Sequence, residues 1–137
     1  MKCSSSYFLF LTLFLFAQIS SAQKKDIVKG ASIEWEKKSH DFGDIVEGEK
    51  VEFVYKFTNS GSDPLIITNV QVTCGCTTPK GWPRDPVMPG HRGEIPVQFN
   101  SLGKFGRQNK VVTIVSNAAE GNSQVTFSAN VLEKKLN

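Results

Sequence analysis

Hydrophobic and polar residues alternate along much of the chain, and this two-residue period predicts β-strands. Successive side chains of a strand point to opposite faces of its sheet, so a half-buried strand has an apolar residue at every second position. Residues 51–57, 95–99 and 125–131 follow this pattern, with apolar residues such as Phe53 and Phe57 at alternate positions. Dense β-branched residues predict further strands over 32–35, 65–72 and 110–116.

Turn-forming residues lie between the predicted strands. Glycine, proline, asparagine and aspartate are concentrated at 59–64, 89–93, 102–106 and 117–122, where they supply the backbone conformations and local hydrogen bonds of turns. No stretch carries a sustained helical period. About seven short strands separated by turns are typical of a β-sandwich with Greek-key connections. The sequence therefore predicts an all-β fold of this architecture.

Residues 73–92 would form a long loop between two of these strands. Structureless loops of this length are uncommon in compact domains, so the segment should carry either a strand of its own or a function. Its prolines exclude a central strand, and Trp82 can anchor it against the sandwich. We expect residues 74–77 to be extended and the remainder to be an irregular edge segment. The residues that we expect to contact a partner are Thr77, Trp82, Arg84, His91 and Arg92.

The first residues have the pattern of a leader for export. A positive charge at Lys2 precedes an apolar run over 7–16, and small residues follow it. We expect residues 1–22 to be a signal peptide, because the apolar run is shorter than the roughly 20 residues that cross a bilayer. Residues 23–30 are predicted to be a flexible lead-in, and residues 31–137 a single domain. The protein would then lie outside the cytoplasm, in the periplasm or secreted, without a transmembrane anchor.

The charged residues do not indicate a nucleic-acid-binding protein. The chain of 137 residues has 16 Lys and Arg against 13 Asp and Glu, and these charges are scattered rather than gathered in a basic stripe. The sequence also lacks a nucleophile elbow, a zinc-protease motif and a phosphate-binding loop. We therefore expect a protein that is not an enzyme and does not bind nucleic acid.

The most distinctive chemical feature is a pair of cysteines separated by one glycine, Cys74-Gly75-Cys76. In an extended strand these two residues would lie on one face with their Cα atoms about 6.6 Å apart, at the long edge of the disulfide range. The pair can form a local disulfide, hold Cu(I) between two thiolates, act in thiol redox chemistry or bond to another molecule. The sequence leaves these alternatives open.

Two histidines, His40 and His91, are candidates to complete a metal site with the cysteines. Their spacing from Cys74 and Cys76 does not fit a compact metal finger. We favour surface or turn positions for both, with His91 the better candidate because it lies in the same segment as the cysteines. We expect no resident cofactor, and copper is the alternative.

Several motifs occur in the order found in a known family. They are His40-Asp41-Phe42-Gly43-Asp44-Ile45-Val46-Glu47-Gly48, F-x-x-x-F-x-N-x-G over 53–61, Pro64-Leu65-Ile66-Ile67, Cys74-Gly75-Cys76-Thr77 and Pro89-Gly90. Together they resemble the bacterial family called domain of unknown function 1573. The resemblance implies an immunoglobulin-like sandwich, similar to ASH and major-sperm-protein domains, which act mainly as scaffolding or binding modules.

The framework motifs also have structural interpretations. We expect the Asn59 side chain to cap backbone groups, Pro89-Gly90 to occupy the centre of a type II turn, and Gly43 to permit a change of strand direction. The function that we predict is an exported, non-catalytic binding or assembly module that holds a protein or glycan partner. The alternative is a metal-handling or thiol-redox protein that acts through the Cys74 and Cys76 pair.

Overall fold

A computed structural model describes residues 26–136 of the chain, so the predicted signal peptide lies outside the described residues. Eight strands lie within this range, and it contains no helix long and apolar enough to span a bilayer. The strands are β1 (Ile33–Trp35), β2 (Ser39–Val46), β3 (Lys50–Asn59), β4 (Ile67–Val72), β5 (Thr77–Pro79), β6 (Arg92–Asn100), β7 (Gly106–Ser116) and β8 (Ser123–Leu132).

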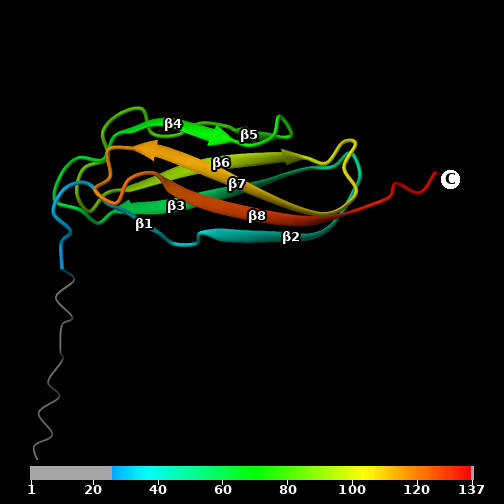
Figure 1. Ribbon diagram of the computed structural model, residues 1–137, viewed down its shortest axis with the longest axis horizontal. Helices are drawn as coiled ribbons and strands as arrows, with labels where there is room; N and C mark the ends of the chain where they lie inside the picture. Colours follow the sequence, from blue (N-terminus) through cyan, green and yellow to red (C-terminus); the bar gives the residue numbers. More distant parts are fainter. Residues whose placement is uncertain (1–25, 137) are drawn as a thin grey trace, which may run out of the picture.

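The strands form two four-stranded sheets packed face to face (Figure 1). One sheet has the order β1-β3-β6-β5 and the other has the order β2-β8-β7-β4, so consecutive strands often cross from one sheet to the other. Neighbouring strands are antiparallel except for β2 and β8, which run parallel. The all-β sandwich predicted from the alternation of residues is therefore confirmed.

The apolar face of each alternating strand fills the space between the sheets. In β3 the side chains of Tyr55 and Phe57 are fully buried, as are those of Ile95 and Phe99 in the adjacent strand β6. The Tyr55 hydroxyl crosses the sandwich and donates a hydrogen bond to the backbone oxygen of Thr126 in β8 at 2.7 Å. Burial raises the pKa of Tyr55 to about 12, so the hydroxyl stays protonated and the two sheets stay linked.

Strand β5 lies inside the segment for which the sequence left a strand and a function as alternatives. Thr77 pairs with Phe99, and Pro79 pairs with Val97 of β6. Proline cannot donate a ladder hydrogen bond, and it is accommodated here because β5 is the edge of its sheet. The segment therefore carries a strand of its own, and β5 and β2 are the two strands that lie outside the six predicted ranges.

The predicted flexible lead-in reaches into the described residues, and its last residues pair with the domain. Val28 forms a β-bridge with Gly61, and the Ser62 N–H lies 3.0 Å from the Val28 oxygen and 2.8 Å from the Gly30 oxygen. The paired region thus begins earlier than predicted. Backbone hydrogen bonds hold these residues rather than buried side chains, so composition did not reveal the pairing.

Asn59 organises the end of the sandwich at which the chain enters it. Its amide nitrogen donates to the backbone oxygens of Asp63 and Val87 at 2.8 and 2.9 Å. Its amide oxygen accepts from the backbone N–H groups of Gly61 and Ser32 at 3.0 and 3.3 Å. The side chain is fully buried, and it caps backbone groups as the sequence predicted.

The predicted turn and bulge glycines take the expected conformations. Gly90 has a φ of 79°, and the His91 N–H donates to the Met88 oxygen at 3.0 Å, so Pro89-Gly90 forms the centre of a type II turn. Gly43 has a φ of 70° at the point where the register between β2 and β8 shifts. Both positions favour glycine because other residues rarely adopt a positive φ.

Candidate functional site

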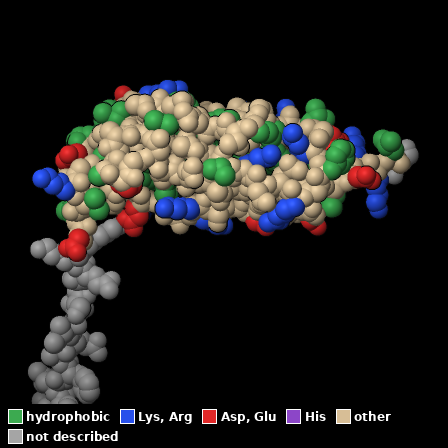
Figure 2. Space-filling view, in the orientation of Figure 1, with side chains coloured by type: hydrophobic (Ala, Val, Ile, Leu, Met, Phe, Trp, Pro, Cys, Tyr) green, Lys and Arg blue, Asp and Glu red, His purple; other side chains and the backbone are tan. Residues whose placement is uncertain are grey.

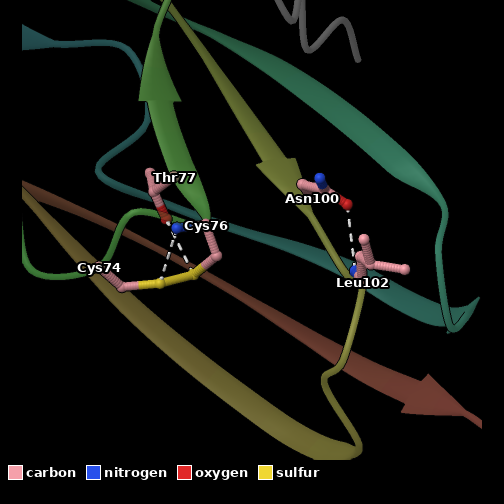
Figure 3. The surroundings of a disulfide bond; sticks show 5 residues. All are labelled: Cys74, Cys76, Thr77, Asn100 and Leu102. Atoms are coloured by element: carbon pink, nitrogen blue, oxygen red, sulfur yellow. Dashed lines mark hydrogen bonds between the residues drawn. A yellow bond between two sulfur atoms is a disulfide. The ribbon is translucent and has the colours of Figure 1, made fainter.

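The two cysteines lie in a tight turn that connects β4 to β5. The Thr77 N–H donates to the Cys74 oxygen at 3.1 Å, and this hydrogen bond closes the turn. The Cα atoms of Cys74 and Cys76 are 5.2 Å apart, and their sulfur atoms form a disulfide (Figure 3). The prediction that residues 74–77 are extended is wrong, because the turn brings the two Cα atoms closer than a strand would and into the usual disulfide range.

The two sulfur atoms have different surroundings. The Cys76 N–H donates to Cys74 Sγ at 3.0 Å, whereas Cys76 Sγ lies 3.9 Å from the Thr77 hydroxyl, a weak contact (Figure 3). Both cysteines are half-buried, and Cys76 packs against the core. Gly75, between them, is exposed. The Cys74 sulfur is thus the better stabilised of the two by hydrogen bonding.

The turn is attached to the last residues of β6. The Asn100 N–H donates to the Cys76 oxygen at 2.8 Å. The Leu102 N–H donates to the Asn100 amide oxygen at 3.0 Å (Figure 3). Thr77 is only 4% exposed, so this predicted contact residue is a buried part of the framework. The disulfide therefore lies beside the β6–β7 loop, at the end of the sandwich opposite Asn59.

Exposed apolar side chains gather at this same end of the molecule, and sequence reasoning did not single them out. Leu132 pairs with Val46 at the ends of β8 and β2. Phe105 lies next to this pair along the sheet, because the following residue, Gly106, pairs with Val131. Leu102 lies in the same loop as Phe105. We call Val46, Leu102, Phe105 and Leu132 the apolar end; their exposed fractions are 38, 67, 61 and 43%. Figure 2 shows hydrophobic side chains among basic ones where the C-terminal segment leaves the sandwich.

Backbone contacts hold the apolar end in shape. The Ser101 hydroxyl is buried between the backbone oxygens of Val46 and Glu49, at 3.0 and 2.9 Å. The Gly103 N–H donates to the Glu47 carboxylate at 2.7 Å, which ties the β6–β7 loop to the β2–β3 turn. A surface fixed in this way loses little conformational entropy when a partner binds it.

Trp82 and Arg84 form a second exposed feature of the predicted contact segment. Trp82 packs partly against the core, and its indole Nε1 is buried without a hydrogen-bond partner among the described residues. The Arg84 guanidinium carbon lies 3.8 Å from the centre of the indole ring, a cation–π contact. The expectation that Trp82 anchors the segment agrees with this packing.

His91 and Arg92 lie at the other end of the sheet from the cysteines. The Asn59 N–H donates to the His91 oxygen, whereas Cys76 pairs with Asn100, so the nine residues of β6 separate the two groups by roughly 26 Å. Arg92 is exposed and forms an ion pair with Glu36 at 3.6 Å. Thr77 therefore lies at the opposite end of β6 from His91 and Arg92, and the structure does not bring the predicted contact residues into one site.

His40 occupies a position that sequence reasoning placed at the surface or in a turn. It lies in β2, and its imidazole stacks on the ring of Phe53 with the ring centres 3.9 Å apart and the planes 10° from parallel. Its Nδ1 is buried without a hydrogen-bond partner among the described residues. Burial lowers the pKa of His40, Lys37 lowers it further, and Asp41 opposes them. His40 thus lies in a strand rather than in a turn and is half-buried, and its stacking could not be predicted because it depends on how the two sheets face one another.

The arrangement of ligands does not favour the copper alternative in this state. Copper(I) binds thiolate sulfur, but Cys74 and Cys76 are bonded to each other. Within residues 26–136, no group of three or more His, Cys, Asp and Glu side chains is placed to hold a metal ion. What the site offers chemically is a disulfide with one hydrogen-bonded sulfur, next to an apolar surface.

Comparisons with known proteins place the chain in a family. A family model described as "Protein of unknown function (DUF1573)" matches residues 33–131, which confirms the resemblance drawn from the motifs. Nothing among the curated proteins matches. The immunoglobulin-like architecture is also confirmed by solved structures, each of which is less than 25% identical to the chain and so supports the fold alone.

Three of these structures illustrate the likeness. A protein of unknown function from Porphyromonas gingivalis has a TM-score of 0.63 and 17% identity, covering 75% of this chain and 47% of that one. The secreted serine protease VesC from Vibrio cholerae has a TM-score of 0.60 and 14% identity, and the match covers 77% of this chain and 24% of that one. The ASH/PapD-like domain of human CEP192 has a TM-score of 0.58 and 12% identity, and the match covers 77% of this chain and 89% of that one. The chain thus spans about half of the first protein and a quarter of the second.

Proposed function

We propose, starting from the fact that the chain belongs to the DUF1573 family of proteins of unknown function, that it is an exported, non-catalytic module that binds a protein partner. Immunoglobulin-like domains often serve as interaction modules, which supports the class of function by analogy of fold. The leader pattern of residues 1–22 supports export. The observation that carries the proposal is the apolar end.

The apolar end has the properties of a docking surface. Its large side chains are 38 to 67% exposed, although those on the inward faces of the same strands are buried. Water contact with apolar surface costs free energy, so exposed apolar side chains grouped at one place often mark a binding site. The Ser101 and Gly103 hydrogen bonds fix their positions before any partner arrives. We commit to a protein rather than a glycan, because aliphatic side chains predominate among the four residues.

Site-specific photocrosslinking tests this proposal in the native cells. A photoreactive phenylalanine analogue replaces Phe105, and the matched control carries it at Ile66, which is also exposed and apolar but lies at the Asn59 end. We expect one protein adduct at position 105 that is absent at position 66. The adduct should disappear in a chain that also carries Leu102→Ser and Leu132→Ser.

Capture is followed by a binding measurement with the purified partner and the purified full chain. The double Leu→Ser variant should weaken binding by about tenfold or more if the apolar end carries the contact. Equal adducts at positions 66 and 105, unchanged affinity in the double variant, or binding only to glycans would contradict the proposal. Circular dichroism of the variant checks that the sandwich is still folded.

A further inference from the structure

The disulfide contributes little to holding its own turn. The Thr77 N–H to Cys74 oxygen bond already closes the turn, and the Asn100 N–H fixes the Cys76 oxygen to β6. A disulfide that encloses only three residues removes little entropy from the unfolded chain compared with one that closes a long loop. The backbone can therefore keep its shape when the sulfur–sulfur bond opens, which is a requirement for a disulfide that is used reversibly.

Gly75 has no internal reason to be glycine. Unlike Gly43 and Gly90, it is not among the residues with a positive φ. A Cβ atom built on it meets nothing within 4 Å outside its chain neighbours. A side chain would therefore fit the fold, at an exposed position between the two cysteines. Glycine at this position keeps the exposed side of the turn free of a side chain that could hinder another molecule.

We propose that Cys74–Cys76 is a site of reversible thiol–disulfide exchange with a dithiol protein of the compartment to which the chain is exported. The asymmetry of the two sulfur atoms assigns their roles. The Cys76 N–H that lies 3.0 Å from Cys74 Sγ stabilises negative charge on that sulfur, so Cys74 is the better leaving group. Cys76 Sγ is then the atom that an incoming thiolate attacks.

The exchange proceeds in two balanced steps. A thiolate of the partner attacks Cys76 Sγ and forms a mixed disulfide, while the Cys74–Cys76 bond breaks and its electron pair leaves on Cys74 Sγ. The partner's second thiol, as a thiolate, then attacks the partner sulfur of the mixed disulfide and releases the Cys76 thiolate. The two protons lost by the partner thiols are taken up, through water, by Cys74 and Cys76. The partner is oxidised to a disulfide by two electrons, and this chain is reduced to a dithiol.

This inference goes beyond the proposed binding function and stands on different atoms. Leu102 connects the two features, because its N–H bonds to Asn100, which in turn holds Cys76 (Figure 3). A partner seated on the apolar end would therefore lie beside the disulfide. The chemistry at the sulfur atoms nevertheless requires only the turn, so a small thiol can test it without docking.

Trapping the mixed disulfide tests the assignment of the attacked sulfur. The probe is a thioredoxin-type protein whose second active-site cysteine is replaced by serine, incubated with the full chain in native buffer and then treated with an alkylating agent. Peptide mass mapping should place the probe on Cys76 in about tenfold excess over Cys74, with Cys74 alkylated. An adduct on Cys74, equal adducts on both, or an adduct that forms only in urea would overturn the proposal.

A Gly75→Ala variant tests the approach to the bond. Its thermal midpoint and its reduction by 2-mercaptoethanol should match those of the wild-type chain, whereas its reaction with the thioredoxin-type probe should be slower by about tenfold. If Gly75→Ala leaves the reduction rate unchanged with both 2-mercaptoethanol and the probe, the inference drawn from Gly75 is wrong. If both rates fall equally, the substitution acts on the disulfide ring and not on the approach of a protein. The Leu102→Ser, Leu132→Ser variant should keep its rate with 2-mercaptoethanol, so failure of docking and failure of exchange are distinguishable.

Discussion

The two ends of segment 73–92 are fastened to the sandwich in different ways. At the Asn59 end, a fully buried amide forms four hydrogen bonds to backbone groups, and the chain passes through a tight turn whose glycine has a positive φ. At the disulfide end, the turn of Cys74–Thr77 is half-exposed and lies next to the apolar end. The first end is specified by polar groups that leave nothing unsatisfied. The second combines a partly exposed disulfide with exposed apolar side chains.

The difference separates residues that the fold explains from residues that it does not explain. Both ends contain residues that mark the family resemblance, and only their surroundings show which of them the fold explains. Asn59 is accounted for by its hydrogen bonds, whereas Gly75 and Phe105 have no comparable internal role. Substitutions at the Asn59 end should therefore affect stability, and substitutions at the disulfide end should affect interactions.

The largest effect is expected for Asn59→Ala. It removes the acceptor of the buried Gly61 and Ser32 N–H groups, and it also removes the amide donor to the Asp63 and Val87 oxygens. Because each buried unsatisfied group costs about 1–3 kcal/mol, the free energy of unfolding in urea should fall by about 3 kcal/mol or more. The matched control is Asn122→Ala at an exposed position, which should change it by less than about 0.5 kcal/mol. If Asn59→Ala lowers the free energy of unfolding no more than the control does, the Asn59 end is not the tightly specified end of the segment.

The same substitution at two glycines sharpens the contrast. A Cβ at Gly93, which pairs with Phe57 near the Asn59 end, would overlap the Phe57 ring, so Gly93→Ala should destabilise the protein by about 2 kcal/mol. Gly75→Ala should change stability by less than about 0.5 kcal/mol. Chemical unfolding of both variants provides the measurement. A similar loss in the two would show that the disulfide end is as tightly specified as the other.

Opening the disulfide should have a smaller effect on stability than losing Asn59. The chain-entropy relation for three enclosed residues gives about 1.6 kcal/mol, so a Cys74→Ser, Cys76→Ser variant and the reduced wild-type chain should both lose about that much or less. Urea unfolding with and without reductant measures it. Complete unfolding of the reduced chain would mean that the disulfide is a structural requirement, contrary to the comparison.

The smallest effect is expected from His40, which lies in β2 and takes part in neither fastening. The folded state disfavours protonation of His40, because burial lowers its pKa below 6.5. The charge of Lys37 lowers this pKa further. Asp41, which is paired with Arg107, raises it and so opposes the other two causes. The unfolded chain therefore binds more protons, and the free energy of unfolding should fall as the pH drops below about 6.5. The stability lost in this window should be reduced in His40→Gln and retained in His91→Gln, as measured by unfolding at several pH values.

Sequence reasoning recovered the parts of the fold that depend on local pattern. Alternation predicted β3, β6 and β8, and turn chemistry predicted the roles of Asn59 and Pro89-Gly90. The conformation of the cysteine turn was missed because a short Cys-x-Cys motif fits either a strand or a turn, and the Thr77 to Cys74 hydrogen bond decides between them. No local pattern distinguishes the two.

The candidate site was harder to predict because its parts meet through register. Val46, Leu102 and Leu132 are far apart in the sequence, and only the pairing of β2 with β8 and the position of the β6–β7 loop brings them to one end. The same register sends His91 away from the cysteines, although the sequence places them in one segment. An exposed Phe105 beside two turn glycines was the one local signal that could have indicated this surface.

The parallel pairing of β2 and β8 has a mechanical consequence. The first described residues and the C-terminal segment leave the sandwich at opposite ends (Figure 1), and β2 begins toward the first of these ends whereas β8 finishes toward the other. Tension applied between those ends would drag the two parallel strands along each other, loading the whole ladder from Ser39 to Val46 at once instead of peeling it bond by bond. A sandwich with this pairing is expected to resist stretching along its long axis more strongly than one whose terminal strands are peeled apart.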